Sequence, residues 1–197
     1  MRELELKGVV PDERLARDRI EADGATLVFE GELLDRRYDM PERPLTAGDR
    51  VLRLRVERAH GRERAVLAFK GPASLAHGYK LREEVGTNVE HPATMHDILC
   101  AIGYSVTREI DREVAVYALR GAVVRFERFP RMDALVEVEG DPATIERAIA
   151  SLGIPRVAFT PDALAVFVRA YEQRTGSRGA ICRRELAGDF RYQVDDG

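Results

Sequence analysis

The stretch Arg2-Glu3-Leu4-Glu5-Leu6-Lys7-Gly8-Val9-Val10 decides the fold, because charged and apolar residues alternate along it. Side chains alternate faces along a β-strand, so Glu3, Glu5 and Lys7 share one face, while the leucines and Val9 fall roughly on the other. Such a strand is typical of a sheet with one solvated face over a core. A strand whose charged face lines a functional site has the same pattern, and the rest of the chain must decide between the two.

The pattern returns in several later segments, in which acids or bases again occupy alternate positions. We expect charged strands at residues 51–56, 65–70, 81–85 and 134–139. Three of the charged strands precede a helix that begins near a proline and ends at a glycine, with the helices predicted at about 11–23, 92–102 and 142–152. This combination of a charged strand and a helix occurs three times, with other segments between the copies. Three copies are too few for a solenoid and indicate one domain made of related halves.

Composition excludes several classes of protein. The 197 residues are 45% hydrophobic and 33% charged with a net charge of -3, which fits a globular domain and gives no general reason to expect nucleic-acid or membrane binding. No apolar run approaches about 18 residues, and no secretory signal pattern opens the chain. Cys100 and Cys182 lack metal-ligand spacing, so we expect a reducing, cytoplasmic setting.

The amphipathic helices are numerous enough to cover the apolar strand faces, which leaves the charged faces pointing into an enclosed space. Buried charges must be paired or must hold a ligand. Carboxylates bind Mg²⁺ or Mn²⁺, and guanidinium and ammonium groups bind phosphate oxygens, so the mixture favours a polyanion with divalent cations. The alternative is an ordinary barrel or sheet with a salt-bridged, wet face. The side chains concerned are Glu3, Glu5, Lys7, Arg53, Arg55, Lys70, Arg82, Glu84, Glu137 and Glu139.

These motifs, in this order, resemble those of the CYTH proteins, also called triphosphate tunnel metalloenzymes. Glu3-Leu4-Glu5-Leu6-Lys7 matches the family's E-x-E-x-K opening, and the later matches are an L-R-x-R strand, a K-G-P turn, an R-x-E strand and an E-x-E strand. The resemblance covers about residues 2–160. The corresponding segments are Leu52–Arg55, Lys70–Pro72, Arg82–Glu84 and Phe126–Glu139.

The resemblance implies an α+β fold in which an eight-stranded antiparallel β-barrel forms a tunnel with helices around it. It implies one domain over residues 1–197, with a C-terminal helical segment at about 160–190 packed on the barrel. It also implies Mg²⁺ or Mn²⁺ as cofactor, and Glu3, Glu5 and Lys7 as catalytic residues. The implied metal ligands are Glu3, Glu5, Glu84, Glu127, Glu137 and Glu139, and the implied triphosphate ligands are Lys7, Arg53, Arg55, Lys70, Arg82, Arg108 and Arg112.

The chain departs from the family pattern in a few places. Glu127 stands where the family has an aspartate, and Ile110 stands where a lysine is expected, although Arg108 shares a strand face with Arg112 and could substitute. The C-terminal basic residue that many members use has two candidates here, Arg183 and Arg184. A solvated tail is the simpler interpretation of both.

Two reactions fit such a site. Attack of a ribose hydroxyl on the α-phosphorus of ATP gives cyclic AMP and pyrophosphate, and the opening motif, the K-G-P turn and the length favour this class IV adenylate cyclase branch. Attack of water on a terminal phosphorus makes the protein a triphosphatase for inorganic, thiamine or nucleoside triphosphate. A non-catalytic binder of triphosphate or polyphosphate is the third hypothesis. In each case the partner is a small-molecule triphosphate, and a homodimer is left open.

Overall fold

The structure, a computed structural model, describes residues 2–192, with side chains from Leu4 onward. Its strands are β1 (Arg2–Val9), β2 (Thr26–Asp39), β3 (Val51–Ala59), β4 (Arg62–Lys70), β5 (Ser74–Ala76), β6 (Tyr79–Val89), β7 (Ser105–Leu119), β8 (Ala122–Arg128), β9 (Leu135–Glu139) and β10 (Phe159–Thr160). Its helices are α1 (Glu13–Ala22), α2 (Pro44–Ala47), α3 (Pro92–Ala101), α4 (Pro142–Leu152), the 3₁₀ helix η1 (Arg156–Ala158), α5 (Leu164–Thr175) and α6 (Arg183–Leu186).

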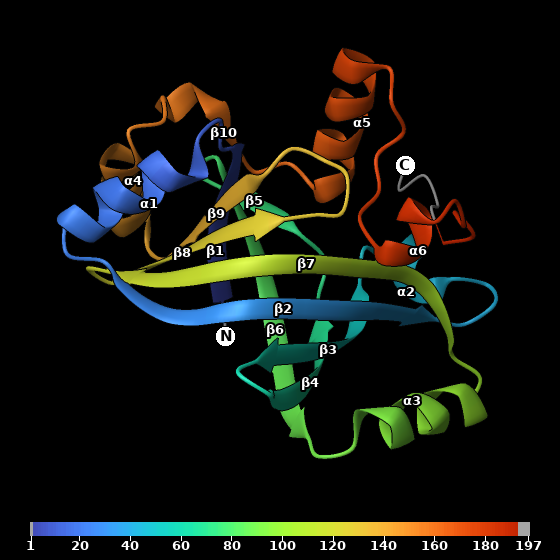
Figure 1. The fold of residues 1–197 in the computed structure, drawn as a ribbon. Coiled ribbons are helices and arrows are strands. Elements are labelled where there is room, and N and C mark those ends of the chain that lie inside the picture. The colour runs from blue at the N-terminus through green and yellow to red at the C-terminus, as the bar shows by residue number, and fades with distance from the viewer. Residues whose placement is uncertain (1, 193–197) are drawn as a thin grey trace.

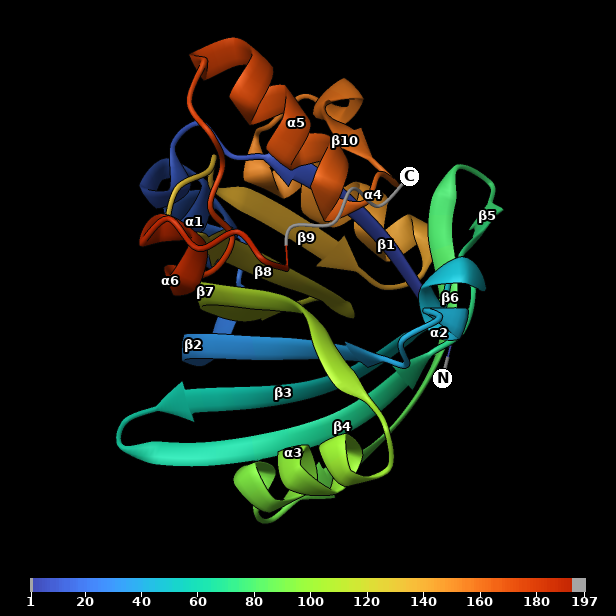
Figure 2. The same cartoon turned by 90° about the vertical axis from the view of Figure 1, so that its right-hand side faces the viewer.

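Eight strands close into an antiparallel barrel in the order β1-β9-β8-β7-β2-β3-β4-β6, and β6 pairs back with β1 (Figure 2). The opening strand makes the closure possible because its two ends have different neighbours. Residues 5–9 pair with β9, and residues 2–5 pair with β6. A closed barrel has no free edge to cover. The predicted α+β fold with an eight-stranded antiparallel barrel is confirmed.

The main hydrophobic core lies outside the barrel. Leu6 of β1, Val138 of β9 and Phe126 of β8 point outward and pack with Ile20 of α1 and Ile145 of α4. Helices α1 and α4 lie side by side over this part of the wall (Figure 1). The helices therefore supply the apolar contacts that a barrel interior usually supplies, and the interior is free for charged side chains.

Two smaller clusters complete the packing. Helix α3 places Leu99 against Tyr38 and Leu54 on the outer faces of β2 and β3. Helix α5 places Val168 in a cluster with Ile110 of β7 and Leu135 of β9. Phe129 and Ile181 belong to the same cluster. None of the helices in residues 2–192 is long and apolar enough to span a membrane.

The glycine stops are as predicted, because Gly24, Gly103 and Gly153 follow the three helices with positive φ angles of 93°, 97° and 68°. Two local predictions are wrong. Gly71-Pro72 at the end of the charged strand 65–70 predicts a loop over residues 71–79, but this segment contains the short strand β5, which pairs with β6. Val9 lies on the face of Lys7, where the register places it opposite Leu135, because the strict alternation of β1 continues to its end.

Candidate functional site

The inward faces of the strands line a cavity of about 770 Å³ inside the barrel. Thirteen Lys or Arg and seven Asp or Glu residues line it, in a chain whose net charge is -3. Basic residues are therefore concentrated in the tunnel. A concave, positively charged site of this kind attracts polyanions.

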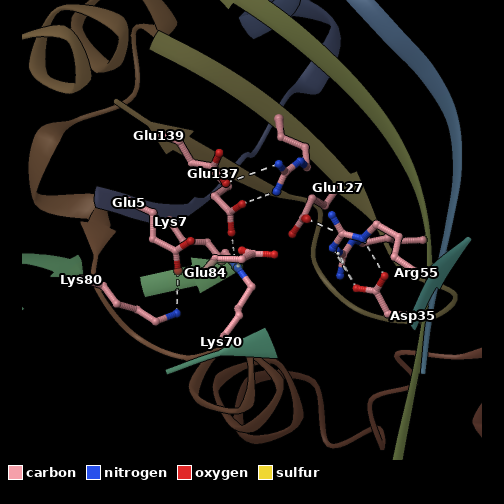
Figure 3. A network of polar contacts seen from close by, with 12 residues as sticks. Glu5, Lys7, Asp35, Arg55, Lys70, Lys80, Glu84, Glu127, Glu137 and Glu139 are labelled. Carbon is pink, nitrogen blue, oxygen red and sulfur yellow. Dashed lines mark hydrogen bonds and ion pairs between the residues drawn. The ribbon is translucent and has the colours of Figure 1, made fainter. Parts of the chain in front are cut away.

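Three carboxylates meet on one wall of the tunnel. Glu5 of β1 lies opposite Glu139 of β9 in the strand register, and Glu137 is two residues from Glu139 on the same face. One carboxylate oxygen from each lies within 4.8 Å of the others, and Figure 3 shows the three side chains pointing toward a common space. We call this group the carboxylate trio. Hard oxygen ligands in such a cluster suit Mg²⁺ or Mn²⁺.

Cations from neighbouring strands surround the trio. The ammonium of Lys7 lies 2.6 Å from Glu137, and that of Lys80 lies 2.5 Å from Glu5. Arg125 contacts Glu137 and lies 3.3 Å from Glu139. Burial opposes ionisation of Glu137, but Lys7 and Arg125 outweigh it and hold the pKa of that carboxyl well below its usual range. Glu137 is therefore an anion at any ordinary pH.

Another acidic residue, Asp35 on the opposite wall of the tunnel, is surrounded by arginines. Asp35 of β2 accepts hydrogen bonds of 2.7 and 2.9 Å from Arg55 and one of 3.2 Å from Arg112, and Arg53 lies 3.9 Å away. Although burial opposes ionisation, these guanidiniums lower the pKa of Asp35. We call these four residues the Asp35 cluster. The carboxylate fixes the orientation of three guanidiniums that line the tunnel.

Several buried guanidinium donors are left unsatisfied. The Nε atoms of Arg53, Arg82 and Arg112 are buried and donate no hydrogen bond to any described residue, and Arg112 Nε is only 3.1 Å from Glu127 without the alignment for one. A buried unsatisfied donor costs about 1–3 kcal/mol. An anion with several oxygen acceptors, such as a polyphosphate, would satisfy these donors.

Lys70 of β4 and Glu84 of β6 form an ion pair on the part of the tunnel wall between the carboxylate trio and the Asp35 cluster. Lys70 lies opposite Glu84 across β4 and β6, with its ammonium 2.5 Å from the carboxylate. Glu84 also accepts a hydrogen bond of 3.1 Å from Arg53. At the rim, Arg82 pairs with Asp49, which follows α2.

The tunnel brings together every predicted site residue whose side chain is described. Glu3 pairs with Arg82 in the backbone register of β1 and β6, and its side chain lies outside the described residues. The residues on the cavity wall are Glu5, Lys7, Arg53, Arg55, Lys70, Arg82, Glu84, Arg108, Arg112, Glu127, Glu137 and Glu139.

Some cavity residues were missed from the sequence. Lys80 and Arg125 lie two positions before Arg82 and Glu127, so continued alternation could have found them, and Asp35 lies two positions before Arg37, another cavity residue that was missed. Arg169 reaches the cavity from α5, and no strand pattern points to it.

The two candidates for a C-terminal basic residue of the site, Arg183 and Arg184, lie outside the cavity. Arg183 pairs with Glu32 and Arg184 with Glu109, and neither arginine lines the cavity. Ile110 lines the cavity as part of an apolar cluster, while Arg108 is 9% exposed on the same wall.

Solved structures with the same fold include proteins named as nucleotide cyclases. A putative adenylate cyclase of Vibrio parahaemolyticus has a TM-score of 0.72 and 18% identity, covering 85% of this chain and 97% of that one. The PH1819 protein of Pyrococcus horikoshii OT3 has a TM-score of 0.70 and 19% identity, covering 89% and 99%. A putative adenylyl cyclase of Hippeastrum, described as revealing a dominant triphosphatase activity, has a TM-score of 0.62 and 15% identity, covering 89% and 96%.

No model of a protein family matches the sequence, and no curated protein matches it. At identities below 20%, the structural likeness shows the fold alone. The fold is that of these putative cyclases and is consistent with a CYTH-type tunnel domain. The activity has to be argued from the site.

Proposed function

We propose that this protein is a CYTH-type enzyme that holds a triphosphate in its tunnel with a divalent cation and acts on a phosphoanhydride bond. One observation carries the proposal: the carboxylate trio lies in the same enclosed cavity as a large excess of Lys and Arg. Carboxylates alone would suggest a metal site, and cations alone would suggest an anion site. Their juxtaposition is what metal-assisted phosphoryl chemistry requires.

The donor chemistry of the trio fits a hard divalent cation. Glu5, Glu137 and Glu139 offer oxygen ligands only, and their nearest oxygens already converge within 4.8 Å. A cation bound there would neutralise charge on the phosphate oxygens of the reacting group. Figure 3 shows Glu84 and Glu127 on the tunnel wall beyond the trio; Glu84 pairs with Lys70, and Glu127 lies near Arg112.

The basic residues bind and orient the triphosphate. Burial would lower the pKa of Lys7, but the charges of Glu137, Glu127 and Glu5 raise it above its ordinary value, so Lys7 acts as a fixed cation and not as a proton acceptor. Asp35 fixes the guanidiniums of Arg55 and Arg112 before substrate arrives. Such preorganisation reduces the entropy lost when the phosphates bind.

Cyclisation of ATP to cyclic AMP and pyrophosphate is the reaction we place first. The order of sequence motifs favours it, and the Vibrio neighbour is named a putative adenylate cyclase. Hydrolysis of a triphosphate is the second candidate, and the name of the Hippeastrum neighbour favours it for a protein of the same fold. In both reactions the tunnel residues would hold a triphosphate group, and the reactions differ in the nucleophile, a ribose hydroxyl or water, and in the phosphorus that it attacks.

Product analysis tests the proposal. The purified protein is incubated with ATP, with inorganic triphosphate and with thiamine triphosphate, in Mg²⁺ and in Mn²⁺, and the products are separated. Cyclic AMP with pyrophosphate supports the cyclase, and orthophosphate without a cyclic product supports the triphosphatase. Binding of triphosphate without turnover of any substrate would leave a non-catalytic binder and overturn the proposal.

A further inference from the structure

The sequence uses lysine very sparingly, and every lysine lies on the tunnel wall. Of its 31 Lys and Arg residues only three are lysines, and each of the three has its ammonium beside a glutamate. A lysine ammonium is a compact charge on a flexible stem, whereas a guanidinium is a rigid fork that can hold a carboxylate with two hydrogen bonds. Lysine therefore suits a carboxylate that has to be released. The pairs are Lys7 with Glu137 at 2.6 Å, Lys70 with Glu84 at 2.5 Å and Lys80 with Glu5 at 2.5 Å.

The pair of Lys80 and Glu5 differs from the other contacts of the carboxylate trio. Among the described residues, Lys80 is the one cation that forms an ion pair with Glu5, whereas Glu137 contacts both Lys7 and Arg125. Figure 3 shows Lys80 reaching Glu5 beside the trio. Withdrawal of this single ammonium would leave the carboxylate of Glu5 without an ion pair and open to another cation.

Lys80 also has a place to go. A side pocket of about 300 Å³ opens beside the tunnel, and Lys80 and Asp49 line both spaces. The side chain of Lys80 is 20% exposed, against 12% for Lys7. The carboxylate of Asp49 is an anionic partner on the wall of the side pocket, and its side chain is 55% exposed. A flexible lysine stem can therefore turn its ammonium from the trio toward the side pocket.

We propose that Lys80 neutralises Glu5 in the metal-free tunnel and withdraws into the side pocket when a divalent cation binds the carboxylate trio; this inference rests on the metal site of the proposed function. A divalent cation among the three carboxylates would lie close to an ammonium that is 2.5 Å from Glu5, and like charges in an enclosed site repel strongly. Glu5 thus exchanges one cation for another. The affinity of the trio for metal is set by this exchange, and Lys80 is the residue that tunes it.

Calorimetric titration with Mn²⁺, in the absence of any triphosphate, tests the exchange with two opposite variants. Lys80→Met removes the competing ammonium and should tighten Mn²⁺ binding about 10-fold, the effect of one hydrogen bond between charged groups. Lys80→Arg should weaken it, because a guanidinium can hold Glu5 with two hydrogen bonds. Lys70→Met is the matched control. It removes an ammonium at the same distance from a glutamate outside the trio, and should change Mn²⁺ affinity less than about 3-fold.

Chemical labelling of the wild type gives a second measurement that needs no variant. The three lysines are acetylated with N-hydroxysuccinimidyl acetate with and without Mn²⁺, and the rate at each is measured by mass spectrometry of peptides. Lys80 should react faster in Mn²⁺, because it leaves its contact with Glu5 and enters the side pocket. Lys70, whose partner Glu84 is not in the trio, should react at an unchanged rate and serves as the internal control.

The outcomes separate this inference from the proposed function. If neither the wild type nor Lys80→Met binds Mn²⁺, the metal site of the proposed function fails and the exchange fails with it. If the wild type binds Mn²⁺ but Lys80→Met and Lys70→Met change the affinity equally, the metal site stands and Lys80 is not the residue that is exchanged. Labelling of Lys80 that is unchanged or slower in Mn²⁺ would overturn the exchange in the same way.

Discussion

The two acidic regions of the tunnel differ in how many cations each carboxylate meets. In the Asp35 cluster, one carboxylate with a side chain 3% exposed faces three guanidiniums. In the carboxylate trio, three carboxylates share Lys7, Lys80 and Arg125, and the side chain of Glu139 is 21% exposed. Both groups lie on inward strand faces. All four are carboxylates, so the main difference between the two groups is the number of cations around each carboxylate.

This difference in surrounding charge indicates which of the two groups of carboxylates is suited to bind a metal ion. A cation approaching Asp35 would meet three fixed positive charges, and the carboxylate oxygens there already accept hydrogen bonds from Arg55 and Arg112. In the trio three carboxylates share three cations, and one oxygen of each carboxylate lies within 4.8 Å of the others, so a metal ion there would meet three anionic ligands. We therefore propose a structural role for Asp35 and a metal-binding role for the trio.

The largest effect is expected from Glu139→Gln. The change keeps the shape of the side chain and removes one anionic ligand from the trio. Turnover in Mg²⁺ or Mn²⁺ should fall about 100-fold or more, which is about 2.7 kcal/mol of transition-state stabilisation, whereas triphosphate binding in EDTA should change far less. Steady-state kinetics and calorimetry measure the two quantities.

Glu63→Gln is the matched control for Glu139→Gln. Glu63 is on β4, pairs with Arg58 and lies outside the tunnel. It should keep wild-type turnover. Equal losses of turnover and of triphosphate affinity in Glu139→Gln would contradict a metal role for the trio.

Asp35→Asn should chiefly affect stability. The variant removes the carboxylate that pairs with the buried guanidinium of Arg55 and one of the two that lie beside Arg112, and breaking a buried ion pair by removing one partner costs about 3–5 kcal/mol. Urea unfolding of the wild type and the variant at pH 7 gives the difference. A difference under about 1 kcal/mol would show that the cluster is not held by Asp35.

The pH dependence of that difference has a definite sign. Because the arginines lower the pKa of Asp35 in the folded state, its contribution to the free energy of unfolding is complete above the unfolded pKa of about 3.9. It is lost as the pH falls from there toward the lowered pKa of the folded state. The wild type and Asp35→Asn should therefore differ by a constant amount from pH 5 to 8 and converge in acid.

Addition of a divalent cation should give a smaller effect. At a concentration ten times its dissociation constant, Mg²⁺ or Mn²⁺ should stabilise the wild type by about 1.4 kcal/mol. For a chain of this size that corresponds to a rise of roughly 3–6 °C in the melting temperature. The rise should persist in Asp35→Asn and disappear in Glu139→Gln. The same rise in Glu139→Gln would place the cation elsewhere.

Most of the tunnel wall could be predicted from sequence because strand alternation is a local property, whereas the eight-stranded barrel was implied by the resemblance of the motifs to the CYTH family. Once Glu5 and Lys7 define the inward face of a strand, the two-residue periodicity of strands predicts which other charged residues on that strand also point inward. The match of Glu5 with Glu139 depends on strand register across the closed barrel, and only the structure supplies it. Arg169 lies on a helix, so its arrival at the cavity depends on how α5 packs on the barrel.

Removal of the Arg183 side chain should have the smallest effect. The arginine is 59% exposed and pairs with Glu32 outside the tunnel, and exposed ion pairs contribute about 0–1 kcal/mol. Arg183→Ala should therefore unfold within about 1 kcal/mol of the wild type and bind triphosphate with unchanged affinity. Arg53→Ala, which removes a buried tunnel guanidinium, should weaken binding about 10-fold in the same titration, the loss expected for one hydrogen bond to a charged group. A comparable loss in Arg183→Ala would mean that Arg183 contacts the bound triphosphate, and that the C-terminal segment is part of the binding site.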